Sequence, residues 1–348
     1  MAKRIVGLDV GFTSLRAAQV NFTYKGVPLI EKVAELKYPK GLVEFGEIRD
    51  RSAFTKFLKE FWDQQKFATR HVALAAGSLH VFARELSVPV MSVQRIKESL
   101  PFMMEGILPV PAEQLYIDFY PAEMRSDASG QTVHGLAVAA EKVAVDALVN
   151  CVVDARLRPM AVDFIPFALA RVHLGPETPN QLNVLIDIGA GATNVVIAVG
   201  TVPQFVRVIP NGGQDVDRDL MVGLNIPEED AAAVKVRLTK APRAKGDLAA
   251  WNIMQDSIKE FVTTVKNTFD YYQQSHTNDA KPIAGIMLSG GGSHLGGLIE
   301  TFEKEFAVPV VLNDAASHIQ KAANLKVNDE TLERMAIAVG LALGGANE

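Results

Sequence analysis

Apolar runs interrupted by glycine-centred breaks occur near the start of the chain and again near its midpoint. Residues 5–20 read IVGLDVGFTSLRAAQV, and residues 184–199 read VLIDIGAGATNVVIAV. In both segments apolar residues flank a break of Gly and small residues, a pattern that predicts a strand, a tight turn and a second strand. The equivalent aspartates, Asp9 and Asp187, lie 178 residues apart, close to half the chain. The pattern therefore predicts two related halves with one such hairpin each.

Other apolar patterns predict the elements of the second half. Residues 283–288 (IAGIML) form an apolar run followed by the glycine cluster SGGGS, which predicts a strand, a turn and a helix over about 294–306. Residues 247–274 carry apolar side chains at helical spacing and predict one long helix. The apolar segment 335–345 (MAIAVGLALGG) is too short to span a membrane and predicts a buried helix.

Composition narrows the class of protein. Of 348 residues, 48% are hydrophobic and 22% are charged, which excludes intrinsic disorder. The net charge of −5 disfavours non-specific binding of nucleic acid, which needs clustered Lys and Arg. The single cysteine, Cys151, excludes an intrachain disulfide and a Cys-rich zinc site and fits a reducing compartment. Without a signal peptide or an apolar run of about 18 residues, a cytoplasmic location is expected.

Glycine-centred turns of this kind suit phosphate binding. Gly has no Cβ, so the backbone can approach a phosphate closely and direct several N–H groups at it. The hydroxyl groups of Thr13, Ser14 and Thr193 add donors. Asp9 and Asp187 would hold Mg²⁺ through water, because Mg²⁺ keeps much of its hydration shell. Two facing turns would clamp a polyphosphate from both sides, whereas two ordinary hairpins are the alternative that the matched spacing disfavours.

Four motifs carry a resemblance to a known family. They are residues 7–16 (GLDVGFTSLR), 187–193 (DIGAGAT), 210–213 (PNGG) and 289–292 (SGGG). In this order they resemble the phosphate, linking and adenosine motifs of the actin-like ATPase superfamily. Within it, the chain resembles the PilM family of type IV pilus assembly proteins, relatives of the cell-division protein FtsA. Residues 92–121 resemble the small subdomain that these relatives carry.

The resemblance implies an α/β protein with the actin-like ATPase fold. Two ribonuclease-H-like domains would face a nucleotide cleft, with a small inserted subdomain. The first domain is expected at residues 1–87 and 158–180, the insertion at 88–157, the second domain at 181–211 and 279–348, and its upper subdomain at 212–278.

The resemblance also implies which residues bind ATP. They are the first-hairpin residues Asp9, Gly11, Phe12, Thr13, Ser14 and Arg16, the second-hairpin residues Asp187, Gly189, Ala190, Gly191 and Thr193, the linking residues Gly212, Gly213 and Lys235, and the adenosine residues Gly290, Gly291 and Gly292. Three positions depart from the family: Arg16 replaces a usual Lys, Asp217 a usual Thr, and Ala232 a frequent Glu. With these changes nucleotide binding is still expected, at an affinity that the loss of the Glu would weaken, and hydrolysis is expected to be slow at most.

Asp163 is a weak catalytic candidate. It lies near the start of a predicted helix, where the superfamily often places a residue that orients water. A carboxylate at that position can instead cap the helix N-terminus, and this second interpretation is the favoured one.

The resemblance implies a cytoplasmic adaptor that binds Mg-ATP. Its partner would be an inner-membrane protein of the PilN type, bound through its cytoplasmic N-terminal peptide in a groove around the small subdomain and the first domain. The chain would then lie at the inner face of the cell membrane through this partner. Contacts with other pilus assembly ATPases and self-association stay open. The alternatives are a small-molecule kinase of the same superfamily, which needs a catalytic base, and a scaffold with a degenerate nucleotide site.

Overall fold

Both glycine-centred hairpins form, and each lies within a larger sheet. The computed structural model describes residues 3–23, 27–44, 46–77, 79, 81–127, 130–175, 181–242, 245–276, 281–312 and 319–346. Strand β1 (Lys3–Val10) pairs antiparallel with β2 (Ser14–Phe22), and β11 (Leu182–Ile188) pairs antiparallel with β12 (Thr193–Val199). Asp9 lies opposite Arg16, and Asp187 opposite Asn194, so the two hairpins share one register.

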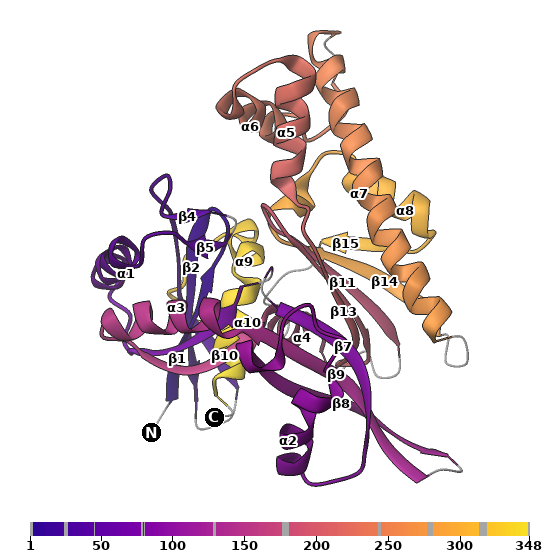
Figure 1. The fold of residues 1–348 in the computed structure, drawn as a ribbon. Coiled ribbons are helices and arrows are strands. Elements are labelled where there is room, and N and C mark those ends of the chain that lie inside the picture. The colour runs from indigo at the N-terminus through magenta and orange to yellow at the C-terminus, as the bar shows by residue number, and fades with distance from the viewer. Residues whose placement is uncertain are drawn as a thin grey trace.

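The first lobe is built on a six-stranded sheet of order β10-β6-β1-β2-β3-β16 (Figure 1). Its other strands are β3 (Pro28–Lys37), β6 (His71–Ala76), β10 (Arg158–Phe164) and β16 (Gln320–Lys321), and its helices are α1 (Arg51–Gln65), α3 (Lys142–Asp154), α4 (Ile165–His173), α9 (Asp329–Arg334) and α10 (Ala336–Gly344). Side chains alternate across the sheet. Val6 therefore packs with the residues of α1 and α3, while Ile5 packs with those of α4 and α10.

The second lobe is built on a five-stranded sheet of order β13-β12-β11-β14-β15. Its other strands are β13 (Val202–Ile209), β14 (Ile283–Ser289) and β15 (Val310–Leu312), and its helices are α5 (Gly213–Leu224), α6 (Glu228–Arg237), α7 (Leu248–Ser275) and α8 (Leu298–Phe306). One face packs on α7 and α8. Residues of the other face, such as Val196, share a core with Phe164 and Ala170 at helix α4. Helix α4 therefore joins the two lobes.

Of two helices predicted in the second half, one has the expected length and the other is shorter. The long helix expected over residues 247–274 is confirmed as α7 (Leu248–Ser275). The helix expected from about residue 294 is shorter than predicted, because it begins at Leu298. Gly297, with φ of +85°, lies in the left-handed region that separates α8 from the preceding 3₁₀ turn Gly291–His294. Among the described helices, none is long and apolar enough to cross a membrane.

The C-terminal segment belongs to the first lobe, which corrects the expectation that residues 279–348 lie in the second domain. Strand β16 pairs with β3, and the buried helix α10 packs on β1, β2 and α4. Glycine permits this packing. A Cβ on Gly7 would lie 1.8 Å from the Ala338 carbonyl oxygen, and one on Gly340 would lie 2.1 Å from the Ala168 carbonyl oxygen. The backbones approach too closely for any larger residue.

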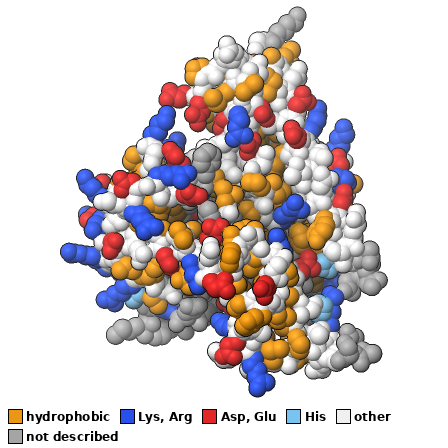
Figure 2. Space-filling model, viewed as in Figure 1, with side chains coloured by type: hydrophobic (Ala, Val, Ile, Leu, Met, Phe, Trp, Pro, Cys, Tyr) orange, Lys and Arg blue, Asp and Glu red, His pale blue; other side chains and the backbone are white. Residues whose placement is uncertain are grey.

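A smaller unit lies below and between the two lobes in Figure 1. It is a three-stranded sheet of order β7-β9-β8, with strands β7 (Val81–Pro89), β9 (Gly130–Glu141) and β8 (Leu115–Asp127), covered by helix α2 (Val93–Met103). On the face shown in Figure 2, hydrophobic side chains gather low in the view over this region. Helix α3 follows the sheet but contributes Leu148, Cys151 and Val152 to the first-lobe core. The other predicted domain boundaries stay predictions.

Candidate functional site

The two hairpin turns line a single cleft between the lobes and have the same local geometry. The backbone N–H of Gly11 donates to the Ser14 carbonyl oxygen at 3.1 Å, and that of Gly189 donates to the Ala192 carbonyl oxygen at 2.9 Å. These donors and acceptors are equivalent positions, 178 residues apart. The chain therefore presents two copies of one turn to the same cleft.

The two aspartates at the strand ends are buried in this cleft. Asp9 is 3% exposed and Asp187 is 4% exposed. Burial raises the pKa of Asp9 to about 6; the charge of Arg16 opposes this shift, and that of Asp187 adds to it. Burial likewise raises the pKa of Asp187, whose Oδ1 accepts a hydrogen bond from the Ser289 hydroxyl at 3.0 Å. The Oδ2 atom of Asp9 accepts no hydrogen bond from the described residues.

Arg16 lies between two carboxylates. Its Nη1 is 3.5 Å from Asp9 Oδ2, and its Nε is 2.9 Å from Glu35 Oε1. Glu35 also accepts a hydrogen bond from the Ser14 hydroxyl at 2.8 Å and lies 3.3 Å from the Nε of Arg334. Burial would raise the pKa of Glu35, but these partners hold it below its ordinary value. The planar fork of Arg suits this double pairing better than a Lys ammonium does.

The linking motif packs directly behind the second turn. The N–H groups of Gly213 and Gln214 donate to the carbonyl oxygens of Gly189 and Ala190 at 2.9 and 2.7 Å. A Cβ on Gly212 would lie 2.5 Å from the Gly189 carbonyl oxygen, so this contact requires glycine. The motif therefore fixes the backbone of the second glycine turn.

Most residues predicted to bind nucleotide lie around this cleft. Those that line it are Asp9, Gly11, Phe12, Thr13, Arg16, Asp187, Gly189, Ala190, Gly290 and Gly291. Gly212, Gly213 and Lys235 lie behind the second turn, Gly191 contacts Phe12, and Gly292 packs on Ile188. The hydroxyl groups of Ser14 and Thr193 are turned to other partners, because they donate to Glu35 and to the Asn211 carbonyl oxygen.

Sequence reasoning missed several residues of the cleft. Asn194, Arg334 and Ile337 also line the cleft. Glu35 is the second carboxylate with which Arg16 forms an ion pair. Asn194 had a signal, since it occupies the position of Arg16 in the second hairpin. Arg334 had none, because it lies 299 residues from its partner Glu35.

Asp163 lies away from the cleft and lines a different cavity. Its Oδ1 accepts a hydrogen bond from the Phe164 N–H at 2.7 Å, and its Oδ2 pairs with the guanidinium of Arg171. Helix α4 begins after Phe164 and has no side-chain cap. The favoured N-cap interpretation is therefore wrong, because Phe164 occupies the N-cap position and Asp163 lies within strand β10, paired with Arg171.

The donor set of the cleft fits a magnesium-bound polyphosphate. Mg²⁺ in such sites takes one or two carboxylates, with water and phosphate oxygens completing its shell. Asp9, with one oxygen free of hydrogen bonds, and Asp187 supply the carboxylates, and the two glycine turns supply backbone N–H groups. In the described part of the chain, no three His, Cys, Asp or Glu side chains form a metal site of their own.

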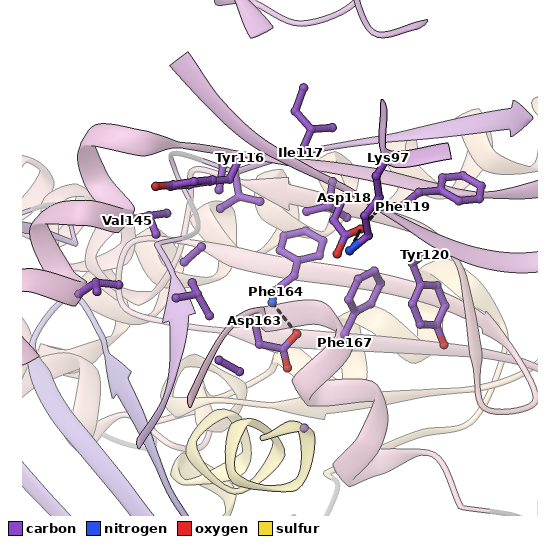
Figure 3. Close-up of a pocket in the computed structure, with 18 of the residues that line it drawn as sticks. Lys97, Tyr116, Ile117, Asp118, Phe119, Tyr120, Val145, Asp163, Phe164 and Phe167 are labelled. Carbon is purple, nitrogen blue, oxygen red and sulfur yellow. Dashed lines mark hydrogen bonds and ion pairs between the residues drawn. The ribbon is translucent and has the colours of Figure 1, made fainter. Parts of the chain in front are cut away.

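A second, larger cavity of about 650 Å³ lies between the small sheet and the first lobe. Its walls are β8, β10, α3 and α4, and Figure 3 shows Phe164, Phe167 and Tyr120 gathered at its centre. The rings of Tyr120 and Phe167 stack with their centroids 4.4 Å apart. The ring of Phe164 meets that of Phe167 edge-on, with 5.3 Å between the centroids. Its volume lies within the range of about 300–1,000 Å³ that is typical of ligand pockets.

Charged side chains surround the aromatic centre of this cavity. Lys97 lies 3.5 Å from Asp118, and the Tyr116 hydroxyl donates to Asp146 at 2.9 Å. Strand β8 is an edge of the three-stranded sheet, and β10 is an edge of the six-stranded sheet. The cavity therefore combines an apolar centre, a charged rim and two strands that each have a described neighbour on one side only.

Comparisons with solved structures place this arrangement among known folds. The chain is similar to a protein in a structure described as a PilM-PilN type IV pilus biogenesis complex, with 24% identity, a TM-score of 0.85, and 98% of each chain covered. It is also similar to MreB5 of Spiroplasma citri bound to ADP, with 13% identity, a TM-score of 0.53, and 99% and 95% of the two chains covered. These likenesses confirm the expected actin-like fold.

A curated relative is the cell division protein FtsA of Bacillus subtilis. The two are 27% identical over 177 residues, which cover 47% of this chain and 39% of that relative. The chain thus spans well under half the length of FtsA in this match. A family model described as type IV pilus assembly protein PilM matches residues 7–346. With this match over nearly its whole length, and with two equivalent glycine turns facing one cleft, the chain belongs to the PilM family of actin-like proteins.

Proposed function

We propose that this protein is a nucleotide-binding adaptor of type IV pilus assembly. It binds Mg-ATP between the hairpins of Asp9 and Asp187 and receives the cytoplasmic N-terminal peptide of an inner-membrane PilN-type protein. The observation that carries the proposal is the pair of buried carboxylates at equivalent positions of two glycine turns. Family membership and the solved PilM-PilN complex support the partner. The ADP-bound MreB5 supports the nucleotide.

In this proposal each hairpin has a defined task. The turns at Gly11 and Gly189 direct backbone N–H groups at the phosphates, and Asp9 and Asp187 orient water molecules around Mg²⁺. Bound Mg²⁺ would supply charge neutralisation at the phosphates. Arg16 adds a fixed positive charge, because Glu35 holds its guanidinium from the other side.

The cleft is poorly equipped to transfer the phosphoryl group. Among the described residues that line it, the only carboxylates are Asp9 and Asp187, which the metal would engage. Asp163, the weak catalytic candidate for orienting water, lines the other cavity and is paired with Arg171. Slow or absent hydrolysis therefore fits the site better than a small-molecule kinase does, since general-base catalysis needs a group within reach of the nucleophile.

The larger cavity is the proposed groove for the partner peptide. An extended peptide could pair its backbone with the edge of β8 or β10 and place apolar side chains against Tyr120, Phe164 and Phe167. Such binding would place the chain at the inner face of the membrane through its partner.

Helix α3 connects the groove to the cleft. Val145 and Val149 line the groove, whereas Ala147 and Leu148 line a cavity of about 220 Å³ on the other side of the helix. That cavity shares Val10 and three other residues with the nucleotide cleft. A shift of α3 on nucleotide binding would therefore change the groove, to the extent that the two ligands bind the two conformations with different affinity.

Calorimetry of Mg-ATP binding tests the nucleotide site. The wild-type protein and Asp187→Ala are titrated, and phosphate release is measured in the same samples. Binding by the wild type alone, with little phosphate release, is the expected result. A folded, nucleotide-free wild type that binds no Mg-ATP would mean a scaffold with a degenerate site, and turnover of a small-molecule phosphoacceptor would mean a kinase.

A matched pair of variants tests the groove. Val162, which is 41% exposed, lines it, whereas Val153, which is 51% exposed, is not among its lining residues. Fluorescence polarisation would use a labelled peptide with the cytoplasmic N-terminal residues of the PilN-type protein from the same organism. Val162→Trp should fill the groove and weaken binding at least tenfold, with Val153→Trp unchanged. Equal binding by both variants would place the peptide elsewhere.

A further inference from the structure

Phe12 is the one bulky side chain among the residues at the tips of the two phosphate turns. The tips read Gly11-Phe12-Thr13 and Gly189-Ala190-Gly191, so Phe12 occupies the position that Ala190 holds in the second hairpin. A small residue is what a phosphate turn favours, because its backbone must approach the ligand closely. The first turn carries an aromatic ring there instead.

The ring of Phe12 crosses the cleft to the other lobe. A Cβ placed on Gly191 would lie 2.4 Å from its Cδ1 and Cε1 atoms, which means that the ring rests on the backbone of the second turn. The opposite edge of the ring faces Gly46, where a Cβ would lie 3.4 Å from Cε2. Two glycines, one from each lobe, therefore flank the ring.

This contact closes the space that the two turns would offer to phosphate groups. The cleft has a volume of about 70 Å³. Pockets that bind small molecules usually have volumes of at least about 300 Å³. A second contact also joins the lobes, because Nε2 of His294, beside the third glycine cluster, lies 2.8 Å from Oε2 of Glu333 in helix α9. The described conformation is thus a closed one held by contacts across the cleft.

We propose that Phe12 is an aromatic gate: its ring holds the lobes closed and must leave Gly191 before a nucleotide polyphosphate enters. The inference rests on the proposed nucleotide function and deepens it by naming the residue that sets nucleotide affinity. The closed conformation lowers the apparent affinity by the fraction of molecules that are open, since only those bind. Phe12→Ala removes the ring and so raises that fraction.

Calorimetry of Mg-ATP binding gives the first test. Phe12→Ala should bind at least fivefold more tightly than the wild type. The control is Phe102→Ala, because Phe102 is 78% exposed on helix α2 and does not line the cleft. Phe102→Ala should match the wild type. Equal or weaker binding by Phe12→Ala than by the wild type would overturn the gate.

A distance measurement without nucleotide separates the gate from the nucleotide function. Cysteines replace two exposed residues, Lys56 in α1 of the first lobe and Val222 in α5 of the second, and carry spin labels. Cys151 is 1% exposed and should resist labelling. Pulsed electron resonance should give one narrow distance distribution in the protein that keeps Phe12, and a broader distribution at longer distances in Phe12→Ala.

The two measurements distinguish a failure of the gate from a failure of the nucleotide function. Longer distances in Phe12→Ala with no Mg-ATP binding by either protein would uphold the gate and overturn the nucleotide function. Unchanged distances would overturn the gate, whatever the affinity for Mg-ATP. A third variant, Phe12→Leu, keeps the side chain apolar and should give an intermediate distance distribution if the size of the ring holds the lobes closed.

Discussion

The ammonium of Lys235 lies 2.5 Å from a carboxylate oxygen of Asp217, and this ion pair joins helices α6 and α5 behind the second glycine turn. The same ammonium donates to the Gly213 carbonyl oxygen at 2.7 Å. Lys235, one of the residues for which the resemblance implies a contact with nucleotide, is therefore held by other groups of the protein. A Thr at position 217, usual in the family, would leave this ammonium available.

Replacement of Asp217 should release Lys235 toward the cleft. Asp217→Asn removes a negative charge near the phosphates, so the affinity for Mg-ATP should rise several-fold, equivalent to about 1 kcal/mol. Calorimetry measures this rise. The control is Asp219→Asn, an exposed carboxylate on the same helix, which should change the affinity little. A weaker affinity in Asp217→Asn would mean that the ion pair supports the binding conformation.

The burial of Asp9 gives the folded protein a characteristic dependence on pH. Burial raises the pKa of Asp9 to about 6, whereas an Asp in the unfolded chain titrates near about 3.9. The folded state therefore binds this proton more tightly, and ionisation of Asp9 lowers the free energy of unfolding as pH rises from about 4 through 6.

Asp9→Asn should remove the loss of stability that ionisation of Asp9 causes. Its free energy of unfolding should exceed that of the wild type by about 2 kcal/mol at pH 8 and equal it below about pH 4. Urea unfolding at the two pH values measures the difference. The same variant should lose Mg²⁺-dependent nucleotide binding, and wild-type affinity should fall as pH drops through about 6. An equal gain in stability at both pH values would contradict the role of ionisation.

Arg16 should not be replaceable by the Lys that relatives carry. A Lys ammonium is a single point charge and cannot bridge Asp9 and Glu35 as the guanidinium does. Arg16→Lys should lower the free energy of unfolding by about 1–2 kcal/mol, because one buried carboxylate loses its partner. Urea unfolding measures the loss. If Arg16→Lys is as stable as the wild type, the pairing of Arg16 with two carboxylates at once contributes nothing to stability.

A double-mutant cycle tests the contact between Phe12 and Gly191. Ala at position 191 would place its Cβ 2.4 Å from the Phe12 ring, so Gly191→Ala should destabilise the wild type by about 1–3 kcal/mol. In the Phe12→Ala background the clash is absent, and the same substitution should cost little. Thermal unfolding of the four proteins measures the coupling. Additive effects would show that the ring does not rest on Gly191 in solution.

Local sequence patterns predicted the strands and helices, but they did not predict the contacts between residues far apart in the sequence. The hairpins of Asp9 and Asp187 were predictable because glycine breaks and apolar runs act over a few residues. The pairing of Arg16 with Glu35 depends on the register between β2 and β3, which no local pattern sets. The contact of Phe12 with Gly191 depends on how the lobes meet.

The position of the C-terminal segment escaped prediction for a similar reason. The apolar pattern of residues 335–345 predicted a buried helix, and α10 confirms it. The pattern gave no indication of which lobe would bury that helix, because apolar surface has no preferred partner. The close backbone contacts at Gly7 and Gly340 permit the packing of α10 on the first lobe, and they join positions far apart in the sequence.

The return of α10 to the first lobe sets the order in which the protein can fold on the ribosome. The strands and helices of the second lobe lie between Leu182 and Leu312, so that lobe can complete its core while the chain is still growing. Most of the first sheet is synthesised earlier, yet α4 covers only part of the face that carries Ile5, and the rest of that face stays uncovered until α10 emerges. The lobe whose synthesis begins first is therefore the lobe whose core is completed last, and the apolar surface that α10 covers stays exposed until then.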